Sequence, residues 1–166
     1  MANFYLIGMP GCGKSTIGKE ISKELGILLI DADIYLEEKE ERKISDIFKN
    51  DGEEYFRCLE TKYLNELSKN ENIIISTGGG VVTRDENIDI MKKSGKIIFI
   101  DTRVENILVN SSLLGRPLLS GDKNRIYDLY NARYDKYKTS ADYIYINDKD
   151  IKSAAKEISK YIIKNK

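Results

Sequence analysis

The chain alternates short apolar runs with longer segments whose apolar residues recur at helical spacing. The short runs are mostly continuous and rich in isoleucine, which is typical of parallel strands buried on both faces of a sheet. They comprise residues 3–7, 27–30, 72–76, 96–100 and 143–146. The clearest helical segments comprise residues 14–25, 53–67 and 151–163. The alternation predicts an α/β fold of three α/β/α layers with a five-stranded parallel sheet, in one domain over residues 1–166.

A further helix is expected after the fourth apolar run, which is followed by Thr102-Arg103-Val104-Glu105. A threonine three residues before a glutamate is typical of a capping box, in which each side chain bonds the backbone N–H of the other residue. This segment therefore predicts a helix that begins with Thr102 as its N-cap.

The most specific local pattern is GMPGCGKS at residues 8–15, directly after the first apolar run. It matches the phosphate-loop pattern GxxxxGK(S/T), in which glycines allow successive N–H groups to point at a polyphosphate. Lys14 is expected to reach the β- and γ-phosphates of ATP, and Ser15 to offer its hydroxyl to Mg²⁺. A glycine-rich turn that matches by chance is the alternative. The expected ATP-binding residues of the loop are Gly11, Cys12, Gly13, Lys14, Ser15 and Thr16.

Charge and hydropathy exclude several classes of function. The 27 basic and 27 acidic residues cancel, so no bulk charge attracts nucleic acid or an anionic membrane. No apolar run approaches the ~20 residues that span a bilayer, and the first residues begin a strand rather than a signal segment. We therefore expect a cytoplasmic protein that binds neither nucleic acid nor membrane.

The sequence contains two cysteines and no histidine. Because the cysteines lack metal-ligand spacing, they do not predict a zinc site. Cys12 is interpreted as a loop residue within reach of a thiol reagent, rather than as a nucleophile. The lack of histidine means that any general base must be a carboxylate.

Asp31 and Asp33 follow the second apolar run. We expect both side chains on one side of an extended segment, at the sheet edge that carries the phosphate loop. Capping of the following helix is the alternative for either residue alone. Beside a polyphosphate, one carboxylate can hold the Mg²⁺ shell through water, and the other can accept a proton from an attacking hydroxyl.

Three consecutive glycines follow the third apolar run in the segment Thr77-Gly78-Gly79-Gly80. Ligands of open α/β sheets bind beyond the carboxyl ends of the strands, where bare backbone allows a close approach. A tight turn is the alternative, but a third glycine in succession costs backbone entropy without a structural return. The segment therefore favours a binding loop.

Residues 113–121, LLGRPLLSG, predict a mobile lid that carries Arg116. Glycines at both ends allow hinge motion, and a lid arginine can be withdrawn until substrate binds. A plain surface loop with a solvated arginine is the alternative. Two other arginines carry little information alone: Arg57 lies at i,i+3 from Glu60, as in many surface ion pairs, and Arg133 has no diagnostic neighbour.

In their order and spacing these motifs resemble those of the shikimate kinase family over nearly the whole chain. The phosphate loop alone is shared by many enzymes, whereas the whole set is specific. The match comprises GMPGCGKS at 8–15, DAD at 31–33, ISDIF at 44–48, GEEYFRCLE at 52–60, TGGG at 77–80, RPLL at 116–119, and Arg133 with Tyr137, Ala141 and Asp142.

This resemblance implies a P-loop kinase fold and a Mg²⁺-dependent reaction. The γ-phosphate of ATP would pass to the 3-hydroxyl of shikimate, giving 3-phosphoshikimate and ADP. A substrate-binding segment would lie at about residues 31–60 and a lid at about 110–123. We expect the enzyme to be a monomer whose partners are ATP, ADP and shikimate.

The resemblance also assigns residue roles. Lys14, Asp33 and Arg116 would be catalytic, with Asp33 as the proton acceptor and Arg116 also binding ATP. Ser15 and, through water, Asp31 would serve the metal. Glu60 would hold Arg57 in position. The implied shikimate-binding residues are Asp33, Ile44, Phe48, Phe56, Arg57, Gly78, Gly79, Gly80 and Arg133.

Some positions depart from the usual family pattern. Val109 stands where an arginine that stacks on adenine is common, the segment 111–115 has few basic residues, and Asp135 and Thr139 replace a proline and a glutamate after Arg133. None of these belongs to the implied shikimate-binding set. We therefore expect the acceptor to be kept and the affinity for ATP to be modest.

Two other functions stay open. Another small-molecule kinase or a nucleoside monophosphate kinase would share the phosphate loop and lid, but a second nucleotide needs further arginines for its phosphate. A non-catalytic nucleotide-binding switch would need Lys14 and Ser15 but would have no use for the acidic pair or for Arg57 and Arg133.

Overall fold

Each of the apolar runs forms a strand, with ends that shift by at most two residues from the predicted ones. The computed structural model describes residues 1–109 and 123–166. The strands form one parallel sheet in the order β2-β3-β1-β4-β5. Their bounds are β1 (Asn3–Ile7), β2 (Leu29–Asp31), β3 (Ile74–Ser76), β4 (Gly95–Asp101) and β5 (Tyr143–Ile146).

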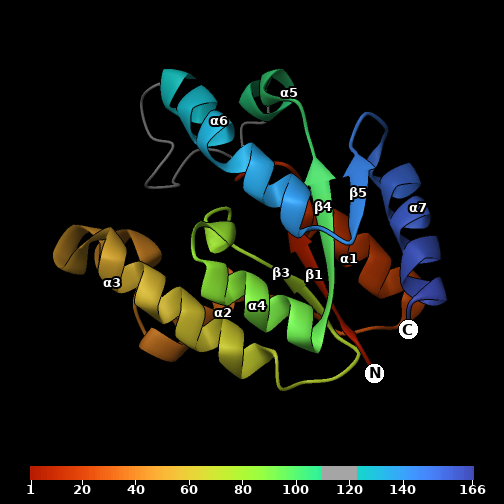
Figure 1. Ribbon diagram of the computed structural model, residues 1–166, viewed down its shortest axis with the longest axis horizontal. Coiled ribbons are helices and arrows are strands. Elements are labelled where there is room, and N and C mark those ends of the chain that lie inside the picture. Colours follow the sequence, from red (N-terminus) through yellow and green to blue (C-terminus); the bar gives the residue numbers. More distant parts are fainter. Residues whose placement is uncertain (110–122) are drawn as a thin grey trace.

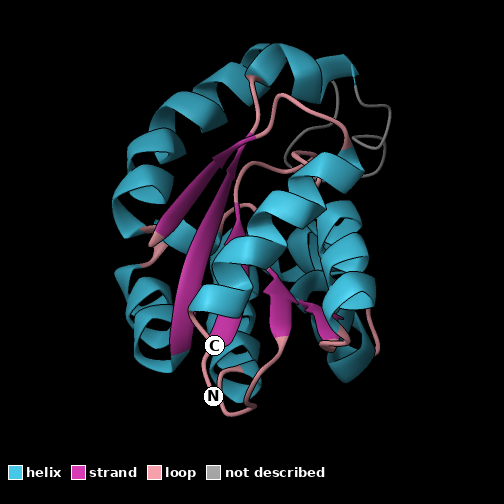
Figure 2. Cartoon of the chain, turned by 90° about the vertical axis from the view of Figure 1, so that its right-hand side faces the viewer, coloured by secondary structure: helices cyan, strands magenta, loops and turns pink. Residues whose placement is uncertain are grey.

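Helices cover both faces of the sheet (Figures 1 and 2). The helix α1 packs against α7, whereas α4 and α6 both contact β4, and α3 packs on α4. Their bounds are α1 (Lys14–Leu25), α2 (Ala32–Glu40), α3 (Ile44–Leu67), α4 (Asp85–Ser94), α5 (Val104–Val109), α6 (Lys123–Ser140) and α7 (Ile151–Lys164), with a 3-10 helix η1 (Val81–Thr83). The chain thus has the three-layer α/β architecture of a P-loop kinase, as the sequence predicts.

The main core surrounds the central strand β1. All residues of this strand are buried, and so are Ile17 and Ile21 on the inner face of α1. Burial is continuous because a parallel strand in the middle of the sheet is covered on both faces. The phosphate loop follows directly on β1, so a fully buried strand holds it in place.

A second, smaller core lies between α2 and α3. It consists of Leu36, Ile47, Phe56, Leu59 and Tyr63. The helix α3 bends at Gly52, where φ is 84° and ψ is 172°, a conformation that other residues rarely adopt. The predicted helix 53–67 is the part of α3 after this bend, and residues 44–51 form a further helical part that the sequence analysis did not predict.

The carboxyl ends of the parallel strands lie at one edge of the sheet. There β1 leads into the phosphate loop, β2 ends at Asp31 and β3 is followed by Thr77, while β4 and β5 are followed by Thr102 and Asn147. Polar residues far apart in sequence therefore surround the loop. Residues 110–122, which include Arg116 and nearly all of the predicted lid, lie outside the described part of the chain.

Candidate active site

The phosphate loop has the backbone that its glycines predict. Gly8, Gly11 and Gly13 have φ angles of 146°, 78° and 98°, which side chains disfavour. A Cβ atom at Gly8 would also lie 2.7 Å from the carbonyl oxygen of Ile100. Gly13 precedes α1 without a side-chain cap, so the first N–H groups of that helix are available to an anion.

Lys14 is buried within its own loop. Its Nζ donates hydrogen bonds to the carbonyl oxygens of Gly8 (2.8 Å) and Met9 (2.9 Å) and lies 3.6 Å from the Sγ atom of Cys12. Cys12 is only 1% exposed. The prediction that a thiol reagent reaches Cys12 is therefore wrong, because its side chain packs beneath the loop against Gly8 and Lys14.

Ser15 links the loop to the ends of two strands. Its hydroxyl donates to Asp31 Oδ2 at 2.5 Å and lies 3.0 Å from the hydroxyl of Ser76 at the end of β3. Asp31 is also the N-cap of α2, since its Oδ1 accepts from the backbone N–H groups of Asp33 and Ile34. Asp31 therefore does both things that the sequence suggested as alternatives: it caps a helix and stands beside the phosphate loop.

Asp33 lies in the first turn of α2 rather than on an extended segment, so that part of the prediction is wrong. The reason is the cap on α2: because Asp31 bonds the N–H groups that follow it, the chain enters the helix directly after Asp31. The turn nevertheless places Asp33 where it lines two cavities.

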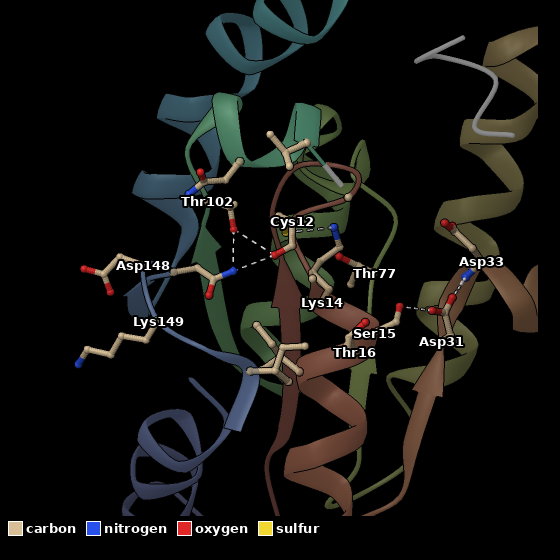
Figure 3. A pocket seen from close by; sticks show the side chains of 17 residues that line it. Cys12, Lys14, Ser15, Thr16, Asp31, Asp33, Thr77, Thr102, Asp148 and Lys149 are labelled. Atoms are coloured by element: carbon tan, nitrogen blue, oxygen red, sulfur yellow. Dashed lines mark hydrogen bonds between the residues drawn. The ribbon is translucent and has the colours of Figure 1, made fainter. Parts of the chain in front are cut away.

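The two cavities adjoin at the phosphate loop. The first, of about 570 Å³, is lined by the loop, by residues after β4 and β5, and by the end of α5. The second, of about 490 Å³, is lined by α2, α3, the three glycines after β3, and Arg133 of α6. Ser15, Asp31 and Asp33 line both. In Figure 3 these side chains stand on one side of the loop, and Thr102 stands on the other.

The second cavity brings together the residues predicted to bind the acceptor. They come from α2, α3, the glycines and α6, which are distant in sequence. One side is apolar, with the rings of Phe48 and Phe56 4.7 Å apart between centroids. The predicted residues found there are Asp33, Ile44, Phe48, Phe56, Arg57, Gly78, Gly79, Gly80 and Arg133.

Arg57 and Glu60 form a buried ion pair at the wall of this second cavity. Arg57 Nη1 donates to Glu60 Oε2 at 2.8 Å, and Arg57 Nη2 donates to Glu53 at 3.3 Å. Burial raises the pKa of the Glu60 carboxyl above its usual range, although Arg57 opposes the change. Burial alone would lower the pKa of Arg57, but attraction and hydrogen bonds to Glu60 and Glu53 together outweigh burial and raise that pKa. The pair therefore keeps a guanidinium at the cavity at a cost in desolvation.

Arg133 contributes a second buried guanidinium. It is 5% exposed, and its Nη1 atom has no hydrogen-bond partner among the described residues. On the same helix the hydroxyl of Tyr137 donates to the carbonyl oxygen of Gly79, and burial raises the pKa of that hydroxyl. Because Tyr137 is fully buried and stacks on Phe99, it fixes α6, and with it Arg133, against the glycine segment.

The three glycines after β3 leave room for neighbouring side chains. A Cβ atom at Gly80 would lie 2.3 Å from the guanidinium of Arg57, and one at Gly79 would lie 2.5 Å from the ring of Pro10. A Cβ at Gly78 would lie 2.7 Å from Glu60 Oε1. The sequence predicts that a ligand approaches the bare backbone of these glycines. In the described chain, side chains that shape the second cavity make such close approaches.

Thr102 does not cap the helix that follows it, so the capping-box prediction is wrong. The helix α5 begins at Val104, and the carbonyl oxygen of Arg103 accepts its first hydrogen bonds. The Thr102 hydroxyl instead donates to the carbonyl oxygen of Cys12 in the phosphate loop. Sequence reasoning also missed Ser76, although this polar residue stands at the carboxyl end of a strand.

Among the described residues, no three His, Cys, Asp or Glu side chains cluster as a metal site. Within the same residues, no helix is long and apolar enough to cross a membrane.

The fold and the site together define a class of enzyme. A parallel α/β sheet, a phosphate loop with its Lys-Ser pair, and an adjoining cavity with two buried arginines are features of a P-loop kinase with a small anionic acceptor. The chain belongs to the shikimate kinase family, since the family model with that description matches residues 10–165.

Individual relatives agree with this assignment. A shikimate kinase from Clostridium botulinum strain Alaska E43 is 48% identical over 161 residues, which cover 97% of each chain. One from Clostridium beijerinckii is 46% identical over 96% of this chain and 94% of its own. The solved shikimate kinase from Acinetobacter baumannii in complex with shikimate is 32% identical, covers 100% of this chain and 95% of its own, and superposes with a TM-score of 0.94.

Proposed function

We propose that this enzyme transfers the γ-phosphate of ATP to the 3-hydroxyl of shikimate, giving 3-phosphoshikimate and ADP. The observation that carries the proposal is the pair of adjoining cavities, one at the phosphate loop and one with two buried arginines, with Ser15, Asp31 and Asp33 between them. The solved relative that is described as a complex with shikimate supports the choice of acceptor.

Arg57 and Arg133 bind the carboxylate of shikimate in this proposal. A planar guanidinium donates two parallel hydrogen bonds to a carboxylate. Arg57 is preorganised by Glu60, and the unpartnered Nη1 of Arg133 is a buried donor that an anionic ligand would satisfy. Ile44, Phe48 and Phe56 face the apolar side of the ring, while Asp33 and the segment Gly78 to Gly80 face its hydroxyls.

Asp33 accepts the proton of the attacking 3-hydroxyl. A carboxylate suits this role because the sequence contains no histidine and because Asp33 lines both cavities. A base must lie within hydrogen-bond reach of the proton that it removes. The position of Asp33 between the donor and acceptor cavities supports this role for a hydroxyl bound beside the loop.

The donor side is arranged for ATP with Mg²⁺. Ser15 and Asp31 offer a hydroxyl and a carboxylate 2.5 Å apart, a donor set that suits Mg²⁺, which takes one or two such groups together with phosphate oxygens and water. When bound, Mg²⁺ would neutralise charge on the β- and γ-phosphates. Lys14 would exchange the carbonyl oxygens of Gly8 and Met9 for phosphate oxygens, and Arg116 would approach from the lid.

The remaining expectations are part of the same proposal. The enzyme would act as a monomer and in the cytoplasm, as one domain over residues 1–166. Arg116 and the lid at about 110–123 keep their predicted role in covering the transfer site.

Three substitutions test the assignment of roles. Arg57→Ala and Arg133→Ala should weaken shikimate binding by ~2 kcal/mol or more, because each removes a charge-assisted contact to the carboxylate. Asp33→Asn should mainly lower turnover, since the amide cannot accept the proton. Calorimetric titration of shikimate and steady-state kinetics separate the two phenotypes. Lys49→Ala and Lys138→Ala are matched controls, because they remove exposed cations from α3 and α6, the helices that carry Arg57 and Arg133.

Unchanged shikimate affinity in both Arg57→Ala and Arg133→Ala would remove the carboxylate clamp. A coupled assay of the unmodified enzyme with shikimate, gluconate and nucleoside monophosphates tests the acceptor itself. Preferred phosphorylation of a monophosphate or of gluconate would refute shikimate as the substrate, and no turnover with any acceptor would favour a nucleotide-binding switch.

A further inference from the structure

One carbonyl oxygen of the phosphate loop is bound by side chains from two other parts of the chain. The oxygen of Cys12 accepts from Thr102 Oγ1 at 3.0 Å and from Asn147 Nδ2 at 3.2 Å. Asn147 Nδ2 also donates to Thr102 Oγ1 at 3.0 Å. The three hydrogen bonds, drawn as dashed lines in Figure 3, form a closed triangle.

This triangle fixes the direction of a peptide group. A peptide unit is planar and trans, so its C=O and its N–H point in opposite directions. The N–H in the same peptide group as the Cys12 carbonyl belongs to Gly13. This residue lines the first cavity, at the phosphate loop, which we call the nucleotide cavity. Holding the oxygen toward β4 and β5 therefore directs the Gly13 N–H away from them.

Little else in the loop would hold that peptide. Gly13 has φ 98° and no Cβ, so the peptide before it rotates with less steric resistance than elsewhere. The carbonyl oxygens of Gly8 and Met9 are held by Lys14, a side chain that leaves them for phosphate in the proposed reaction. The contacts from Thr102 and Asn147 do not depend on Lys14, and Thr102 is only 5% exposed.

We propose that Thr102 and Asn147 are positioning residues for nucleotide binding: by anchoring the Cys12 carbonyl they orient the Gly13 N–H for the polyphosphate of the donor. This inference rests on the proposed function only in so far as the loop binds a nucleotide. It concerns phosphate recognition, which ADP and inorganic tripolyphosphate share, rather than recognition of the base.

Calorimetry with ADP and with tripolyphosphate, each with Mg²⁺, tests the proposal on Thr102→Val, Asn147→Ala and the double variant. Each single substitution should weaken the binding of both ligands about fivefold, because it removes one of the two hydrogen bonds to the Cys12 carbonyl that preorganise the loop. The double variant should lose more than the product of the single effects, because the oxygen is then released. Thr102→Ser keeps the hydroxyl and should restore the affinity.

Ser22→Ala is the matched control. The Ser22 hydroxyl donates to the carbonyl oxygen of Ile27 at 2.6 Å, at the far end of α1 from the loop. Removing it takes away the same kind of contact, so it should lower the melting temperature and leave both affinities unchanged.

Unchanged affinities for both ligands in the double variant, with a lowered melting temperature, would show that the triangle is merely structural. Weakened binding of ADP alone would also overturn the proposal, since it would place Asn147 at the nucleoside. Titration with shikimate in parallel keeps the two proposals apart: failure of the unmodified enzyme to bind shikimate counts against the acceptor, not against the anchoring of the loop.

Discussion

The nucleotide cavity and the acceptor cavity adjoin, yet they are built in different ways. The cavity proposed for the nucleotide centres on one continuous loop, and this loop offers backbone N–H groups and the side chains of Lys14 and Ser15. The acceptor cavity draws side chains from α2, α3 and α6 together with the three glycines after β3. A short motif therefore specifies the first cavity, whereas the fold as a whole assembles the second.

Glycine has a different purpose in each cavity. In the phosphate loop Gly8, Gly11 and Gly13 adopt positive φ, so their torsions are the reason for glycine. Gly79 and Gly80, beside the second cavity, do not have positive φ angles. At these two positions the lack of a Cβ atom makes room for Pro10 and for the Arg57 guanidinium. The same residue type therefore provides conformation in one cavity and space in the other.

The cations also differ. Lys14 is bonded to neutral carbonyl oxygens, which compete weakly with a phosphate. Arg57 is bonded to two carboxylates, one of them buried. In the proposed reaction Lys14 would therefore exchange its carbonyl oxygens for phosphate at little cost, whereas Arg57 is already fixed in place by its ion pairs.

The largest expected effect comes from removing the charge of Lys14 in the phosphate loop. Lys14→Met should lower turnover at least a hundredfold, in line with ~2.7–4 kcal/mol for one preorganised charge-stabilising group. Stopped-flow or coupled kinetics on purified protein measure it. Lys19→Met, on the exposed face of the same helix, should be close to unmodified enzyme, and near-normal turnover in a folded Lys14→Met protein would contradict the mechanism.

A pair of glycine substitutions should separate the two cavities. Gly80→Ala places a methyl group 2.3 Å from the Arg57 guanidinium, so it should weaken shikimate more than tenfold, by loss of the charged contact, and leave ADP nearly unchanged. Gly11→Ala places a side chain at a residue with φ 78°, so it should weaken the binding of ADP and leave that of shikimate nearly unchanged. Titration of both ligands into both variants measures this, and a parallel loss of both ligands in either variant would show that the cavities are not independent.

A smaller effect is expected at the edge of the nucleotide cavity. Val109 lines that cavity and is 84% exposed, so Val109→Arg should be tolerated. A cation stacked on the purine would add ~0.5–2 kcal/mol and lower the Michaelis constant for ATP. The unmodified enzyme should discriminate weakly between ATP and GTP. A strong preference for ATP in the unmodified enzyme would mean that another group already recognises the base.

The smallest effect concerns α6, the helix that carries Arg133 at the second cavity. Next to Arg133 on α6, the Tyr134 hydroxyl donates to Asp101 at 3.0 Å, and this bond with partial burial raises its pKa from 10.0 to about 12. Because the folded pKa lies above the unfolded one, the stabilisation is complete below pH 10 and is lost as the pH rises toward 12. Melting temperatures over this range should fall less steeply for Tyr134→Phe. An equal slope in both proteins would contradict the assignment.

The sequence predicted the sheet well because its strands are buried on both faces and read as continuous apolar runs. The phosphate loop was also predictable, since its torsions require glycine at fixed positions. Arg57 and Arg133 were placed only through the family resemblance, because a buried ion pair and a surface one look alike in sequence.

Other features depend on contacts that no local pattern encodes. The helical position of Asp33 follows from the competing cap at Asp31. The sequence around Thr102 suits a helix cap, but its hydroxyl donates to the carbonyl oxygen of Cys12 instead. Such choices between a local and a distant hydrogen bond are decided by tertiary packing.

The shared wall between the cavities has a consequence for inhibitor design. Among the described residues, Ser15, Asp31 and Asp33 are the ones that stand at both cavities. A carboxylate-bearing ring and a polyphosphate could therefore be joined by a very short linker and occupy both cavities at once. Joining them makes the second contact intramolecular, so a bisubstrate compound gains from the effective concentration of its two halves. The same junction would make its affinity sensitive to linker length, because a longer tether adds freedom that binding must remove.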